Sequence, residues 1–175
     1  MILIIDLEAT CADDGSIPPE QMEIIEVGAC WVTPDGTILD RFQSFVHPVI
    51  NQQLTPFCIK LTGIEQANIG SAPSWPAVTA ALAEFVQRHQ QSDSFWGSWG
   101  NYDARQIERE CVRHGTANPV AQLPHKNLKA AFAKHRHIKQ VGMATALRIV
   151  GLSLEGPHHR ALSDALNIAR LLPWT

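Results

Sequence analysis

Residues 1–8 read MILIIDLE, and this stretch decides the fold that the sequence predicts. The five residues before Asp6 are all apolar, as expected of a central strand that is buried on both faces. Side chains alternate along a strand, so Asp6 and Glu8 point to the same side. Two converging carboxylates favour a divalent cation, because Mg²⁺ and Mn²⁺ prefer oxygen ligands. The structural alternative is an exposed strand end that carries two solvated acids.

Further strands are predicted along the chain after this segment. The range 24–32 is rich in β-branched and small apolar residues, and the turn sequence Pro34-Asp35-Gly36 leads into a hairpin partner at 38–46. A short strand is expected at 94–96. Helical spacing of apolar residues, with Gly115 and Pro173 as stop signals, predicts helices at 76–90, 103–114, 129–134, 143–150 and 160–172. These elements predict an α/β fold, with helices packed on a mixed sheet.

Size and composition favour one packed domain over residues 1–175. Hydrophobic residues make up 45% of the chain and charged residues 18%, which is unlike a disordered polypeptide. The net charge of −3 provides no overall attraction for nucleic acid. However, the range 111–154 has no Asp or Glu and holds half of the 14 basic residues: Arg113, Lys126, Lys129, Lys134, Arg136, Lys139 and Arg148. This stretch is either a solvated surface or part of a track for a polyanion.

The four cysteines are far apart and have neither disulfide-framework nor zinc-site spacing. We therefore expect reduced thiols and a cytoplasmic protein. The apolar run at residues 1–5 is too short for a membrane helix and has no basic start, so we expect no membrane association.

Three more residues complete a candidate catalytic set. Asp103 follows the aromatic loop at 99–102, and His159 stands five residues before Asp164 at the start of the last predicted helix. Each alone has an ordinary explanation, such as a helix cap or a surface histidine. The combination with Asp6 and Glu8 is what indicates a catalytic site.

In order and spacing, this set resembles the DEDDh exonucleases of the proofreading (DnaQ-like) superfamily. The likeness extends to the histone-mRNA and small-RNA 3′ exonuclease (Eri-type) branch through the ranges 6–11, 23–26, 57–64, 98–100 and 156–169. Tyr102 stands where that branch often has Trp, and Pro157 stands where it often has Arg.

The resemblance implies an RNase H-like fold, with a five-stranded mixed sheet flanked by helices, and 3′→5′ hydrolysis of phosphodiester bonds. It implies two Mg²⁺ or Mn²⁺ ions held by the four acids, Asp6, Glu8, Asp103 and Asp164, with His159 as general base. The residues expected to hold the terminal nucleotide are Thr10, Leu61, Thr62 and Tyr102. Because adjacent side chains at a strand-to-helix junction diverge, we expect His158 to have no catalytic role.

The implied substrate is RNA or single-stranded DNA with a free 3′ hydroxyl, and a homodimer is an allowed oligomeric state. Two alternatives stay open. One is a catalytically silent nucleic-acid-binding module, against which the presence of all four acids and His159 argues. The other is a structure-specific endonuclease on the same fold.

Overall fold

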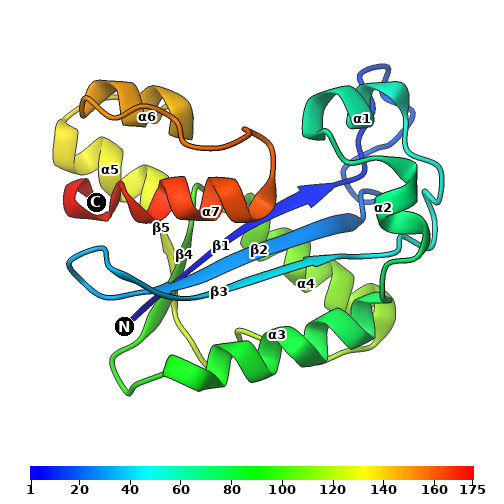
Figure 1. Ribbon diagram of the computed structural model, residues 1–175, viewed down its shortest axis with the longest axis horizontal. Helices are drawn as coiled ribbons and strands as arrows, with labels where there is room; N and C mark the ends of the chain where they lie inside the picture. The colour runs from blue at the N-terminus through cyan, green and yellow to red at the C-terminus, as the bar shows by residue number, and fades with distance from the viewer.

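Five strands form a mixed sheet at the centre of the molecule (Figure 1). The computed structural model describes residues 1–175. The strands are β1 (Ile2–Ala9), β2 (Ile24–Val32), β3 (Ile38–Phe45), β4 (Phe95–Ser98) and β5 (His125–Asn127), in the spatial order β3-β2-β1-β4-β5. The first three form an antiparallel meander, whereas β4 pairs in parallel with β1 and β5 in parallel with β4. The predicted mixed five-stranded sheet is confirmed.

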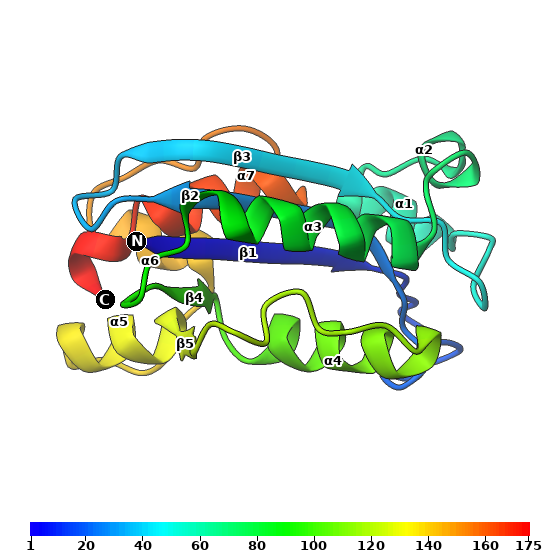
Figure 2. The same cartoon turned by 90° about the horizontal axis from the view of Figure 1, so that it is seen from below.

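Helices cover both faces of this sheet (Figures 1 and 2). One face packs against α3 (Trp75–His89) and α4 (Tyr102–His114), and the other against α5 (Leu128–Arg136), α6 (Met143–Ile149) and α7 (Ala161–Ala169). The short helices α1 (Pro56–Thr62) and α2 (Gln66–Gly70) pack over Ile25 in a third, smaller cluster. The chain ends in a 3₁₀ turn, η1 (Leu172–Trp174). None of the helices has both the length and the apolar character needed to cross a membrane.

The central strand β1 contributes to both apolar layers. Leu3, Ile5 and Leu7 belong to the core under α3 and α4, whereas Ile2 and Ile4 belong to the core under α5, α6 and α7. Since strand side chains alternate, Asp6 and Glu8 continue the second series. The sheet face that carries α7 therefore changes from apolar to acidic at Asp6.

Helix α7 lies unusually close to the sheet at Gly28 of β2. A Cβ atom at Gly28 would be 2.0 Å from the backbone nitrogen of Leu162 and 2.1 Å from the carbonyl carbon of Ala161. Gly28 also pairs directly with Asp6 across the β1–β2 ladder. The missing side chain thus lets the first turn of α7 rest on the sheet beside the acidic end of β1.

Several elements differ from the sequence predictions. The strand predicted from the apolar run before Asp6 continues to Ala9, and the strand predicted at 94–96 is β4. The predicted helix at 160–172 is wrong in its length, because α7 ends at Ala169 and Pro173 belongs to the separate turn η1. Helices α1 and α2 and strand β5 were not predicted, since five to seven residues of helix or three of strand are too short to show periodicity.

Because α7 lies so close to Gly28, Gly28→Ala should destabilise the protein by about 3 kcal/mol or more, since the new methyl group meets backbone that cannot rotate away. The corresponding fall in the thermal midpoint is roughly 6–12 °C. Gly70→Ala is the matched control, because nothing lies within 4 Å of a Cβ there. Equal unfolding temperatures for the two variants in differential scanning fluorimetry would contradict the close contact.

Candidate active site

All five residues predicted to carry the chemistry line one open pocket of about 320 Å³: Asp6, Glu8, Asp103, His159 and Asp164. Four elements bring them together. The end of β1 provides Asp6 and Glu8, the first turn of α4 provides Asp103, the segment before α7 provides His159, and α7 itself provides Asp164. The pocket also contains Tyr102 and His158, and residues 142–143 at the start of α6 form another part of its wall.

The carboxylates of this pocket repel one another. Oxygens of Asp6, Glu8 and Asp164 lie within 4.8 Å of one another. Burial and the neighbouring carboxylates raise the pKa of Asp6 well above its usual range and that of Glu8 to about 8. Burial raises the pKa of Asp103 to about 6 and also raises the pKa of Asp164. No lysine or arginine forms a salt bridge with these four carboxylates, and only Asp164 faces a histidine, His158.

A second observation, the state of one Asp164 oxygen, also fits a divalent cation at this site. Asp164 Oδ1 is buried and has no hydrogen-bond partner. An unpartnered buried carboxylate oxygen is costly, and such oxygens are the ligands that Mg²⁺ and Mn²⁺ prefer. A cation between Asp6, Glu8 and Asp164 would satisfy this atom and neutralise the repulsion.

The two adjacent histidines do not diverge, so that expectation was wrong. Their rings stack, with centroids 4.0 Å apart and planes inclined by 12°. The cause is the backbone of His159, whose φ of 60° lies in the left-handed region and turns both rings to the same side. His158 Nδ1 lies 2.9 Å from Asp164 Oδ2, and the backbone N–H of His159 donates to the same oxygen at 3.0 Å. His158 is therefore part of the site.

A buried acid to which the sequence analysis assigned no role holds this segment in place. Glu26 of β2 is fully buried and accepts hydrogen bonds from Arg160 Nη2 at 2.9 Å, from the backbone N–H of Ala161 at 3.0 Å and from Gln43 Nε2 at 2.5 Å. It pairs with Glu8 across the ladder. The available signal was its position within an otherwise apolar central strand, where a charge needs a partner.

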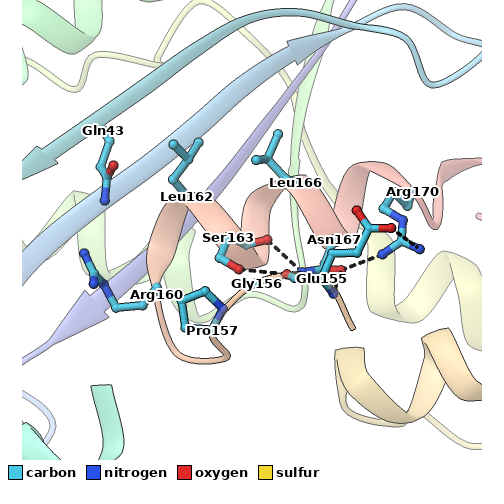
Figure 3. Close-up of a pocket in the computed structure, with 10 residues that line it drawn as sticks. All are labelled: Gln43, Glu155, Gly156, Pro157, Arg160, Leu162, Ser163, Leu166, Asn167 and Arg170. Carbon is cyan, nitrogen blue, oxygen red and sulfur yellow. Dashed lines mark hydrogen bonds and ion pairs between the residues drawn. The ribbon is translucent and has the colours of Figure 1, made fainter. Parts of the chain in front are cut away.

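The outer side of the same segment is tied to α7 (Figure 3). The carbonyl of Glu155 accepts hydrogen bonds from Ser163 Oγ at 3.0 Å and Asn167 Nδ2 at 2.7 Å. Arg170 Nη2 lies 3.0 Å from Glu155 Oε1. Together with Glu26, these contacts hold the histidine segment at both of its ends.

Of the four residues expected to hold the terminal nucleotide, only Tyr102 lines the pocket, with 40% of the residue exposed. Leu61 is exposed on α1. Thr10 and Thr62 are buried, and their hydroxyls are used internally: Thr10 accepts from the backbone N–H of Glu23 at 2.9 Å, and Thr62 donates to the Cys58 carbonyl at 2.8 Å. The nucleotide-binding role of Thr10, Leu61 and Thr62 stays a prediction.

None of the basic residues in the acid-free range 111–154 lines the catalytic pocket. Lys126 instead packs on the ring of Phe95, 3.5 Å from its centroid, and Arg113 pairs with Glu110. No contact between this stretch and the pocket therefore supports a role for it in substrate binding.

A family model described as "Exonuclease" matches residues 3–172. This chain belongs to that exonuclease family. Among its relatives in the family, human 3′-5′ exoribonuclease 1 is 30% identical over 179 residues, which cover 97% of this chain and 50% of the relative. Human ERI1 exoribonuclease 2 is 29% identical over 193 residues, covering 99% of this chain and 28% of the relative. The chain thus spans half or less of the length of these two curated relatives.

Solved structures of exonucleases share the fold. The nuclease domain of 3′hExo, a DEDDh family member bound to rAMP, superposes with a TM-score of 0.88 at 29% identity, over 97% of this chain and 88% of that one. A 3′-exonuclease that recognises the 3′ end of a histone mRNA stem-loop gives a TM-score of 0.89 at 28% identity, over 97% and 78% of the two chains. The resemblance to Eri-type DEDDh exonucleases is confirmed, as is the RNase H-like fold.

Mg²⁺ should stabilise the wild-type protein against heat, because a cation that binds the folded pocket removes the repulsion among its carboxylates. Free Mg²⁺ at about a hundred times its Kd adds roughly 2.7 kcal/mol, or about 5–10 °C in the unfolding midpoint. Asp6→Asn should lose most of this shift, whereas the exposed Asp93→Asn should keep it. An equal shift in all three proteins, relative to EDTA, would place the cation elsewhere.

Proposed function

We propose that this domain is a metal-dependent 3′→5′ exonuclease that acts on RNA or short single-stranded nucleic acid. One observation carries the proposal: four carboxylates, three of them buried and that of Asp6 half-buried, converge with His159 on one pocket in a member of the exonuclease family. The relatives include a 3′-5′ exoribonuclease and a DEDDh nuclease bound to rAMP, which favours a ribonucleotide 3′ end as substrate.

Asp6, Glu8 and Asp164 are suited to hold one divalent cation, and Asp103, beside Asp6, is suited to help hold a second. Bound Mg²⁺ or Mn²⁺ ions supply activation of the attacking water and stabilisation of the leaving 3′ oxygen. The carboxylates orient these charges toward the phosphate, and Tyr102 offers a partly exposed ring on which the terminal base can stack.

His159 is suited to accept the proton of the attacking water. Burial and the neighbouring His158 lower the pKa of its ring below the usual value, which keeps the imidazole neutral at physiological pH. A base must be neutral to take a proton, so the shift favours this role. His158, stacked on His159 and 2.9 Å from Asp164, is suited to position both residues.

A 3′ hydroxyl should be required for cleavage, since the relatives of this chain are named 3′-5′ exonucleases and Tyr102 offers the terminal base a partly exposed ring in the pocket. An end-labelled ten-nucleotide RNA should release mononucleotides, a 3′-phosphate should slow the release strongly, and EDTA should abolish it. Parallel digestion of single-stranded DNA and of duplexes with overhangs would rank the substrates. Efficient cutting of a circular single strand would instead establish the endonuclease alternative. Binding without cleavage would establish the catalytically silent binding module.

His159→Ala should lower kcat by about 10²–10⁴, because the general base is lost while the carboxylates remain. Wild-type activity should fall as the pH drops through the lowered pKa of His159, and this acidic limb should be missing in the variant. His158→Ala should cost less but should not be silent, because it removes a contact to Asp164. A larger loss in His158→Ala than in His159→Ala, in single-turnover assays with saturating Mg²⁺, would reverse the two roles.

A further inference from the structure

A row of arginines runs along α4 away from the catalytic pocket. The helix begins with Tyr102 and Asp103, both of which line the pocket. Arg105, Arg109 and Arg113 follow at intervals of four residues, so they share one side of the helix. At a rise of 1.5 Å per residue, the row extends to about 16 Å from Tyr102 along the helix axis.

These arginines form one side of a groove of about 540 Å³, which Glu20, Glu108 and Val112 also line. The loop between β1 and β2 forms the other side, and Figure 2 shows it in dark blue beside the C-terminal half of α4. Arg109 Nη1 donates to the carbonyl of Pro19 at 2.5 Å, and Arg113 Nη2 donates to that of Glu20 at 2.9 Å. These hydrogen bonds fix the loop beside the helix.

Two of the three guanidinium groups have no acidic partner. Arg113 pairs with Glu110. Arg109 donates only to uncharged oxygens, those of Pro19 and Gln106. Arg105 is exposed and forms no ion pair, and the carboxylates of Glu20 and Glu108 form no salt bridge. Arg105 and Arg109 therefore retain charge and donor groups for an anion.

The direction of these side chains connects the groove with the pocket. Side chains on a helix lean toward its N-terminus, so Arg105 covers the turn that carries Tyr102. The step from Arg105 to Arg109 is about 6 Å along the axis, which suits anionic groups repeated along an extended strand rather than a single small anion. Guanidinium groups match phosphate oxygens in geometry and charge.

We propose that Arg105 and Arg109 bind phosphates of the single-stranded substrate that precede its 3′ end, so that α4 guides the strand into the catalytic pocket. The proposal rests on the proposed function, because it takes this pocket as the place where the 3′ end is held. It moves the substrate track from the acid-free range 111–154 to residues that precede that range.

Binding can be measured without cleavage by fluorescence anisotropy of a 5′-labelled ten-nucleotide single-stranded RNA, with Asp6→Asn as the common background. Arg105→Gln and Arg109→Gln should each weaken binding about fivefold, the value of one exposed ion pair near 1 kcal/mol. The double variant should also reduce the slope of log affinity against log salt by about 1.4, or about 0.7 for each lost phosphate contact. Glu108→Gln should strengthen binding, because it removes a negative charge from the groove.

Arg88→Gln is the matched control, because Arg88 is exposed on α3 and pairs with Asp40. It should change neither affinity nor salt slope. If the arginine variants of α4 behave like Arg88→Gln, the proposal is overturned. In proteins that retain Asp6, Arg105→Gln and Arg109→Gln should lower kcat/KM more for a ten-nucleotide strand than for a dinucleotide. Equal decreases for the two substrates would also overturn the proposal.

The two levels of the hypothesis fail in different ways. Arginine-dependent binding without hydrolysis by the protein that retains Asp6 would leave the track intact and refute the proposed exonuclease function. Hydrolysis by a protein whose RNA affinity does not change when Arg105 and Arg109 are replaced would support the exonuclease function and refute the track.

Discussion

The candidate active site depends on the close contact between Gly28 and the first turn of α7. No side chain separates the strand from the helix, since even a Cβ would lie 2.0 Å from the backbone of Leu162. Gly28 is also the ladder partner of Asp6. The missing side chain therefore lets the helix approach the acidic strand end, where Asp164 joins Asp6 and Glu8 in one pocket. A larger residue at this single position would separate the carboxylates that the proposed chemistry requires.

Around this contact, the protein concentrates negative charge and leaves part of it uncompensated. Glu26 is satisfied by Arg160, by Gln43 and by the start of α7, so it serves to anchor the histidine segment. Asp6 and Glu8 form no salt bridge, and although Asp164 Oδ2 faces His158, Asp164 Oδ1 has no partner at all. Glu26, which is fully paired, thus belongs to the supporting framework, whereas the carboxylates that are not fully paired form the site expected to bind cations.

Much of the fold could be predicted because its central elements have strong local patterns. The apolar run of β1, the β-branched residues of β2 and the helical periodicity of α3 and α4 extend over eight or more residues. Helix α1 is held by the Thr55 cap, Pro56 and the left-handed Gly63, and strand β5 has only three residues, paired with β4. Elements this short owe their structure to caps and neighbours, which periodicity does not reveal. The single domain, the cytoplasmic location and the homodimer stay predictions.

The sequence by itself determined which residues form the acidic set, because alternation along a strand puts Asp6 and Glu8 on one face and the family spacing adds Asp103, His159 and Asp164. Only the tertiary structure decided what surrounds them. It stacked His158 on His159, paired Glu26 with Arg160 across 134 residues of sequence, and left Arg105 and Arg109 without acidic partners. The physical reason is that these contacts join distant segments, or depend on a left-handed backbone at His159, and neither leaves a periodic signal in the chain.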